Sequence, residues 1–174
     1  ADSNLASRAL AIALGEHDLT VQQFAYDYLF SKIGASSYEL EVDSAGTFVG
    51  SSYAYATARD WAKLGQLYLQ NGQWGGKPVL EADWIETVRT PTPGSDSQYS
   101  HGFWHNKNGS EETNAKKWAK IPDDAYLMSG SNGQYVVIVP SMNIVFVRLG
   151  FTYKRTDQLK APINEIFTIL SASP

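Results

Sequence analysis

The residues best suited to chemistry form one polar, glycine-rich turn, Ser129-Gly130-Ser131-Asn132-Gly133. Two glycines and three short polar side chains leave backbone N–H groups open to an approaching ligand. The same composition also suits a tight hairpin loop without chemistry, because most such loops only connect two elements. The turn alone leaves both interpretations open.

Other constellations that carry chemistry are sparse. His101 and His105 are four residues apart, but the Gly102-Phe103-Trp104 between them is typical of a strand, which places both histidines on one edge and not on a helix face. No carboxylate cluster accompanies them and the chain has no cysteine, so we predict no metal site. The sequence has no Gly-x-Ser-x-Gly elbow, phosphate-binding loop or dinucleotide fingerprint, so we predict no cofactor, while a Ser/His/Asp triad stays open.

The turn lies among short runs rich in β-branched and aromatic residues, which fit a pleated sheet. Two of these runs are separated by the turn residues Pro140-Ser141-Met142-Asn143 and predict a hairpin that is buried on at least one face. We predict an antiparallel sheet with strands near residues 101–105, 125–129, 134–140 and 143–150.

Apolar residues also recur at helical spacing, as in Trp61, Leu64 and Leu67. Thr57 is a good N-cap for this segment, and Asp60 three residues later comes close to a capping box. The predicted helices lie near residues 3–14, 19–33, 57–71, 81–88 and 156–171. We therefore predict an α+β fold in which the last helix covers one face of an antiparallel sheet and a helical cluster lies to the side.

Length and composition set the remaining bounds. The 174 residues are enough for one substantial core, so we predict a single domain over residues 1–174. The net charge of −4 shows no excess of basic residues, which argues against nucleic acid as a partner. The sequence contains no apolar run of about 18 residues, so no membrane span is predicted. The absence of cysteine is compatible with either cytoplasm or periplasm and assigns no compartment.

Longer segments carry a resemblance to a known family. They are T-A-R-D-W-A-K-L-G-x-L-Y-L from Thr57, N-G-x-W-x-G from Asn71 with Trp84-Ile85 after it, and S-G-S-N-G-Q-Y-V-V-I-V-P-S-M-N-I-V-F-V-R-L-G from Ser129. This pattern resembles the β-lactamase-like serine hydrolases, the group of class C β-lactamases, penicillin-binding-protein-type esterases and 6-aminohexanoate-oligomer hydrolases. The similarity is strongest over residues 48–150 and implies part of a β-lactamase/transpeptidase-like fold.

Two motifs of that family are missing from these residues. Its nucleophile lies in Ser-x-x-Lys, where the lysine activates the hydroxyl, but no serine here has a lysine three residues later. None of the ten tyrosines begins a Tyr-x-Asn or Tyr-x-Ser. The chain thus resembles the C-terminal part of such an enzyme, and we expect it to be inactive alone.

The resemblance also assigns the polar turn. The family's third motif, Lys-Thr-Gly in class C enzymes, corresponds to Met128-Ser129-Gly130, so the cation that receives a β-lactam carboxylate is absent from this position. The residue after the motif's glycine donates its backbone N–H to the oxyanion, which implies this role for Ser131. The resemblance further implies that Ser129, Gly130 and Asn132 contact the substrate.

The function implied is hydrolysis of a small ester or amide through an acyl-enzyme, once the missing portion is present. The alternative is a self-standing, non-catalytic binding or orphan module. In complete relatives the sheet continues onto N-terminal strands, so we expect the strand near 143–150 to expose an edge through which a homodimer could form.

Overall fold

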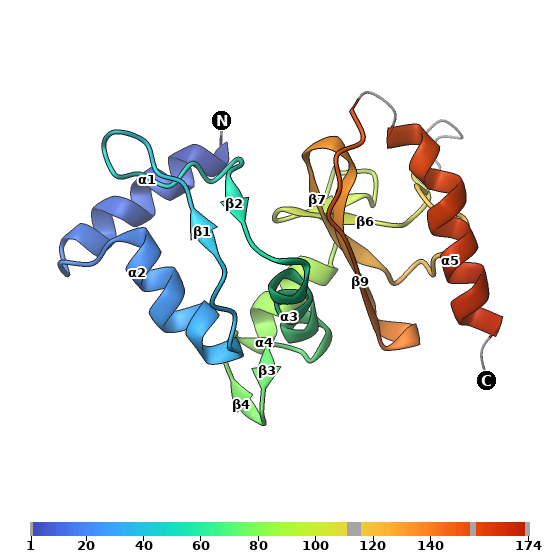
Figure 1. Ribbon diagram of the computed structural model, residues 1–174, viewed down its shortest axis with the longest axis horizontal. Coiled ribbons are helices and arrows are strands. Elements are labelled where there is room, and N and C mark those ends of the chain that lie inside the picture. Colours follow the sequence, from blue (N-terminus) through green and yellow to red (C-terminus); the bar gives the residue numbers. More distant parts are fainter. Residues whose placement is uncertain (1, 111–115, 154–155, 173–174) are drawn as a thin grey trace. The chain divides into compact units, whose positions relative to one another are not determined.

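Figure 1 shows the computed structural model of the chain, which describes residues 2–110, 116–153 and 156–172. The chain groups into two compact units, Ala1–Leu64 and Gly65–Pro174. The single domain expected over residues 1–174 stays a prediction. In the part of the chain that the structure describes, no helix is long and apolar enough to cross a membrane.

The first unit begins with two helices, α1 (Asp2–Gly15) and α2 (Val21–Ala25). α2 starts at a complete capping box. The Thr20 hydroxyl accepts a hydrogen bond from the Gln23 N–H at 3.2 Å, and the Gln23 side chain accepts one from the Thr20 N–H at 3.0 Å. Two backbone donors at the helix start are satisfied in this way.

The helix predicted over residues 19–33 is three helical segments in series. After α2 the chain continues through a π-helical turn, Tyr26–Phe30, and a 3-10 turn, Ser31–Ile33. Gly34 then ends the helical path in the left-handed region, with φ 64°, a conformation that costs glycine little.

A small sheet follows, in a region where the sequence predicts no strand. β1 (Glu39–Leu40) pairs with β2 (Ala54–Tyr55) in antiparallel register. The two-residue strands are too short for their alternation to be recognised in a sequence. Tyr38, just before β1, stacks on Phe30 with ring centroids 3.9 Å apart and fixes this segment to the helices.

The helix α3 (Ala58–Leu69) begins at its predicted N-cap, where Thr57 Oγ1 accepts from the Asp60 N–H at 3.3 Å. The second half of the capping box is taken over by Ser37, whose Oγ accepts from the Thr57 N–H at 3.0 Å. The Asp60 carboxylate instead accepts from the Ser37 N–H at 2.9 Å, the Ser37 hydroxyl at 2.7 Å and the Lys63 ammonium at 2.7 Å. The buried Asp60 is thus fully paired, as a buried charge must be.

The second unit contains a five-stranded antiparallel sheet in the order β5-β6-β7-β8-β9. Its strands are β5 (Tyr99–Ser100), β6 (Phe103–His105), β7 (Tyr126–Gly130), β8 (Gln134–Val139) and β9 (Ile144–Arg148). The predicted strands are confirmed, and β5 is an addition to them. The register places Ser129 opposite Tyr135 and Val137 opposite Phe146.

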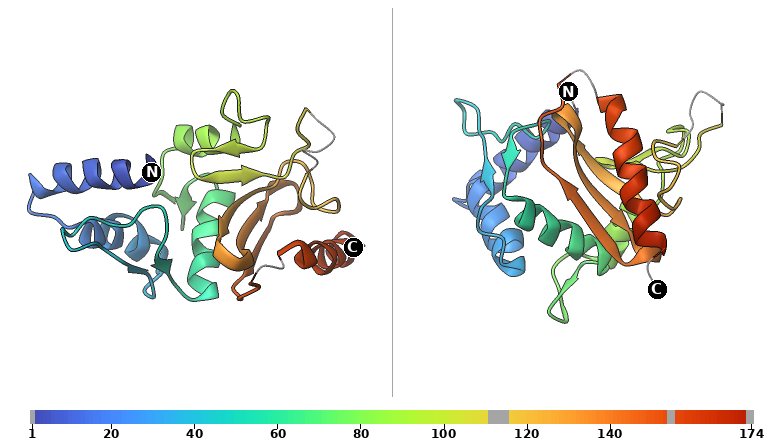
Figure 2. Two further views of the ribbon diagram at one scale, coloured as in Figure 1. Left: turned by 90° about the horizontal axis from the view of Figure 1, so that it is seen from above. Right: turned by 45° about the vertical axis from the view of Figure 1, so that its right-hand side comes forward.

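The last helix, α5 (Lys160–Ala172), covers one face of this sheet after a 3-10 turn, Thr156–Leu159, as Figures 1 and 2 show. Phe167 and Ile163 enter a shared apolar core and are 0% and 2% exposed. The other buried members of this core are Trp118, Ile121, Ala125, Leu127, Tyr135, Val137 and Val139. The prediction that the C-terminal helix covers one face is confirmed.

Helical residues of the second unit cover the opposite face of the sheet. A Cβ placed on Gly65 of α3 would meet Val145 Cγ1 at 2.6 Å and Val136 Cγ1 at 3.0 Å, so the helix backbone lies directly on the strands. The Tyr126 hydroxyl donates to the Tyr68 carbonyl at 3.2 Å and ties β7 to the end of α3. The hairpin of β3 (Gln73–Trp74) and β4 (Lys77–Pro78) and the helix α4 (Ala82–Arg89) follow.

Candidate active site

The polar turn follows directly from β7. Ser131–Gly133 form a 3-10 turn in which Asn132 has φ 56°, a left-handed conformation that asparagine tolerates better than most residues. The Ser131 hydroxyl accepts from the Asn132 side chain at 3.1 Å and the Ser131 carbonyl from the Gln134 side chain at 3.2 Å. Neither bond uses the Ser131 N–H, and Ser131 is exposed.

The end of β9 secures the turn from the other side. The Thr152 N–H donates to the Asn132 carbonyl at 2.9 Å. Arg148 donates to the Gly133 carbonyl at 2.5 Å, the Gly150 carbonyl at 3.1 Å and the Thr152 hydroxyl at 2.7 Å. These bonds fix the backbone of the turn without covering Ser131, which is the arrangement expected of a preorganised N–H donor.

A pocket of about 300 Å³ opens beside the turn, entirely within the second unit. Ser129 is the turn residue that lines it, because its side chain points to the same face of β7 as Leu127. The full lining is Gln98, Trp104, His105, Lys117, Leu127 and Ser129. The volume is at the lower end of the range for small-molecule sites.

His105 is buried and held by a serine. Its Nε2 lies 2.8 Å from Ser100 Oγ, and that hydroxyl donates its proton to the Val88 carbonyl. The imidazole must therefore donate to Ser100 from Nε2. Burial, with a smaller contribution from Lys107, lowers the pKa of His105 below its ordinary value, so the ring is neutral at pH 7. Ser100 is fully buried and its proton is engaged, which gives this pair a structural role and not that of a nucleophile and base.

Lys117 brings a cation to the pocket. Its Nζ lies 4.3 Å from the ring centroid of Tyr135 and 4.9 Å from that of Trp118. Tyr135 is the cross-strand partner of Ser129, so Lys117 lies on the same face of the sheet as the Ser129 side chain. Ammonium groups are attracted to aromatic faces, which fixes the position of this long side chain.

Asn106 holds the segment that carries Lys117. Its side-chain amide donates to the carbonyls of Trp118 and Ile121, each at 2.9 Å, and its Oδ1 accepts from the Trp118 N–H at 3.0 Å. Asn106 is 0% exposed, so each of these bonds is made away from water. An unpaired buried amide would cost free energy of folding, so these three bonds stabilise the position of residues 118–121 against the end of β6.

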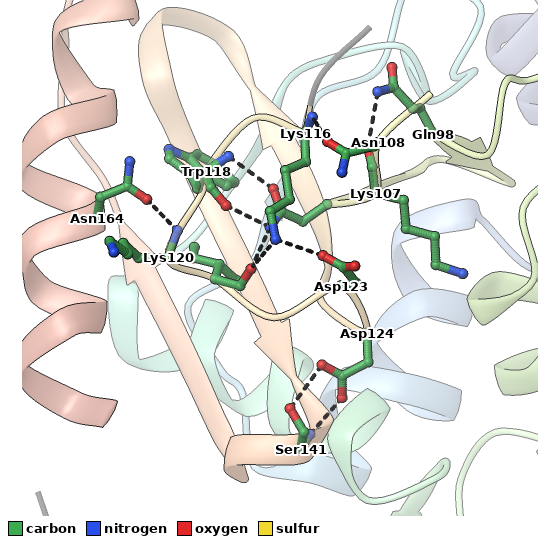
Figure 3. A network of polar contacts seen from close by, with 12 residues as sticks. Gln98, Lys107, Asn108, Lys116, Trp118, Lys120, Asp123, Asp124, Ser141 and Asn164 are labelled. Atoms are coloured by element: carbon green, nitrogen blue, oxygen red, sulfur yellow. Dashed lines mark hydrogen bonds and ion pairs between the residues drawn. The ribbon is translucent and has the colours of Figure 1, made fainter. Parts of the chain in front are cut away.

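Figure 3 shows the polar contacts around this segment. The Lys116 ammonium pairs with Asp123 at 2.7 Å. Asp124 accepts from the N–H and the hydroxyl of Ser141 at 2.7 and 2.9 Å. Asp123 and Asp124 are the first carboxylates after Lys117 in the sequence, and both are paired with other groups.

The sequence located part of this site. In the structure Ser129 lines the pocket, Ser129, Gly130 and Ser131 are exposed, and Asn132 is half-buried. Their roles in binding and catalysis stay predictions. Sequence reasoning missed Gln98, Trp104, Lys117 and Leu127 as lining residues, and no pattern in the chain marks them. Of the two histidines considered above, His105 is buried and His101 is exposed. The ring centroids of His101 and Trp84 are 5.9 Å apart.

Comparison with known proteins agrees with this architecture. A structure of a 6-aminohexanoate-dimer hydrolase, so designated, from Bacillus anthracis superposes with a TM-score of 0.69 at 22% identity, over 90% of this chain and 40% of that one. A β-lactamase from Mycobacterium bovis superposes with a TM-score of 0.64 at 14% identity, over 95% of this chain and 63% of that one. A protein from Bacteroides dorei that is designated a β-lactamase superposes with a TM-score of 0.54 at 15% identity, over 83% of this chain and 49% of that one.

At these identities the superpositions establish the fold, and the chain spans only 40–63% of the length of these structures. No curated protein sequence matches the chain. The family model described as Beta-lactamase matches residues 3–161, which is most of the 174 residues. The chain therefore belongs to the Beta-lactamase family.

Proposed function

We propose that this chain forms the oxyanion side of the acyl-transfer site of a β-lactamase-like serine hydrolase that acts on small esters or amides. The observation that carries the proposal is the turn after β7, where hydrogen bonds hold the backbone and Ser131 is exposed. In the reaction a serine hydroxyl from a Ser-x-x-Lys segment adds to the substrate carbonyl. The serine proton passes to the lysine of that segment, the carbonyl oxygen becomes an oxyanion that accepts a hydrogen bond from the Ser131 N–H, and collapse expels an alcohol or amine that takes up the proton. Water then hydrolyses the acyl-enzyme and releases the acid.

The chain lacks that nucleophile, so catalysis requires a second segment. One N–H donor aimed at developing charge is worth about 2.7–4 kcal/mol of barrier, but only when a nucleophile is about 3 Å away. No serine in the 174 residues is followed by a lysine three positions later. We expect the isolated chain to be inactive toward p-nitrophenyl esters.

The test is complementation. The portion of the Bacillus anthracis structure that this chain does not cover would be co-expressed with the chain, and p-nitrophenyl ester turnover would be measured. Ser131→Pro deletes the N–H and should abolish turnover, whereas Ser131→Ala keeps the N–H and should retain most of it. The backbone accepts proline here, because the preceding Gly130 has φ −93° and ψ 175°, an extended conformation that precedes proline readily.

Two outcomes would overturn the assignment. If Ser131→Ala is as damaging as Ser131→Pro, the hydroxyl carries the role and not the backbone. If the isolated chain hydrolyses the ester, the nucleophile lies within these residues.

A non-catalytic binding module is the second candidate, and the preformed pocket beside Ser129 favours it. Mass spectrometry after gel filtration separates the two functions. A co-purifying N-terminal chain supports the hydrolase, and a chain that purifies alone and binds small molecules supports the module.

A further inference from the structure

Two tyrosines and two glutamates lie on one face of the small sheet of β1 and β2 in the first unit. Glu39 is the cross-strand partner of Tyr55, and the Glu41 N–H donates to the Tyr53 carbonyl at 3.1 Å in the same register. Since side chains alternate along a strand, these four point to one face of the sheet. The residues that alternate with them, at positions 40, 42 and 54, are half-buried. The four residues therefore form the outward face, which we call the acidic tyrosine face.

The side chains of the acidic tyrosine face are exposed. Tyr53 and Tyr55 are 51% and 52% exposed, with ring centroids 6.5 Å apart, and both glutamates are exposed. The Glu41 carboxylate and the Tyr55 hydroxyl interact diagonally across the two strands. Tyr53 has φ 62°, a left-handed conformation that is rare for a bulky side chain, and such backbone strain is concentrated at functional positions. Exposed aromatic residues beside charged ones are typical of an interaction surface.

The charge of the first unit indicates which partner fits this face. The unit holds eight acidic and four basic residues and so carries the whole formal net charge of −4, whereas the second unit holds ten of each. A guanidinium or ammonium group can lie over a tyrosine ring and pair with a carboxylate at the same time. Small-molecule sites are concave, whereas these side chains lie on the exposed face of a two-stranded sheet. A basic protein segment therefore fits the face better than a small cation does.

We propose that the acidic tyrosine face binds a basic segment of a partner protein, with a cationic side chain over the tyrosine rings and paired with a glutamate. Glu39 and Glu41 are two residues apart, which is about 7 Å along a strand. Two arginines separated by one residue in an extended segment have the same spacing. Such a segment can pair with both carboxylates, and its binding needs no catalytic group.

The experiment uses the 174-residue chain and a short synthetic peptide with two arginines separated by one residue. The control peptide carries citrulline at both positions, which keeps the shape of arginine and removes its charge. Binding would be followed by NMR shifts of the amide groups at 39–42 and 53–55. We expect the arginine peptide to bind roughly tenfold more tightly at low salt. This preference should decrease at about 0.5 M NaCl, because salt screens exposed charges.

Three variants separate the face from the overall charge of the unit. Glu41→Gln removes one carboxylate of the face and should lose most of the preference for the arginine peptide. Tyr53→Gly removes one ring and should weaken binding without disturbing the fold, because glycine adopts φ 62° readily. Glu16→Gln is the matched control, since it removes the same charge from an exposed residue of the same unit outside the sheet, and it should leave the affinity unchanged.

Four results would overturn the inference. They are equal binding of the two peptides, equal weakening by Glu16→Gln and Glu41→Gln, unchanged binding by Tyr53→Gly, and amide shifts outside the sheet. Free arginine amide that binds as tightly as the peptide would also overturn it, since the face would then bind a small cation and not a protein segment. None of these measurements involves turnover, so their outcome is independent of the complementation test on Ser131.

Discussion

The paired carboxylate of Asp60 should make the stability of the chain depend on pH in a defined way. Hydrogen bonds from Lys63 and Ser37 lower the pKa of Asp60 from 3.8 to about 2. Because the native pKa lies below that of the unfolded chain, the ionised group stabilises the fold at every pH above about 4. That stabilisation is lost as the pH falls from about 4 toward 2.

The size of the effect follows from the shift. One pKa unit corresponds to about 1.4 kcal/mol, so a shift from 3.8 to about 2 sets an upper bound near 2.5 kcal/mol. The Lys63 side chain is 36% exposed, and solvent weakens its share of the interaction. We therefore expect Asp60→Asn to lower the free energy of unfolding by about 1–2 kcal/mol at pH 7.

Urea unfolding at pH 7 and at pH 3 measures this difference. The difference in free energy of unfolding between the original chain and Asp60→Asn should be largest at pH 7. It should be smaller at pH 3 and decrease further toward pH 2. Glu39→Gln is the control, since it removes an exposed carboxylate from the same unit and should change stability by no more than about 0.5 kcal/mol. A gap of the same size at both pH values would refute the reasoning, because Asp60 would then act through packing and not through its charge.

Two further predictions concern the sheet. Gly65→Ala gains about 1 kcal/mol of helix propensity but overpacks against Val145 at a cost of about 1–3 kcal/mol, so the net change in urea melts should be destabilising. Val145→Ala should turn that substitution into a stabilising one, and additive losses would contradict this packing. Among the described residues β9 pairs only with β8, and we propose a homodimer through its other edge. Light scattering should show a dimer that Leu149→Lys, at an exposed position just after the strand, converts to monomer, and a monomeric original chain would exclude it.

Elements with long or alternating apolar patterns could be predicted from the sequence. β8 and β9 carry continuous β-branched runs with a turn between them, and α3 shows both its N-cap and its apolar stripe. β5 was missed because two residues give no measurable period. The helix after Thr20 was predicted as one segment, since the shift from α-helical to π-helical and 3-10 hydrogen bonding depends on packing and not on local propensity.

The site was predicted only where it is local in sequence. The turn at 129–133 is a contiguous polar segment, so its composition reveals it. Lys117 lies in a polar stretch, 107–120, whose sequence shows no helical or strand period. What places Lys117 is the contact of Asn106 with residues 12 and 15 positions away, and single sequences do not show such pairings. The missing cation at Met128 therefore does not mean that the pocket lacks one.

The register of β7 against β8 links the core to the chemistry. Leu127 and Tyr135 belong to the apolar core under α5, and Ser129 points to the same face because side chains alternate along a strand. A slip of one residue would place Met128 in the pocket and turn Ser129 toward the opposite face. It would also take Leu127, which is 1% accessible, out of the apolar core under α5. The burial that stabilises the sheet thus also determines that the Ser129 hydroxyl and the Lys117 ammonium line the same pocket.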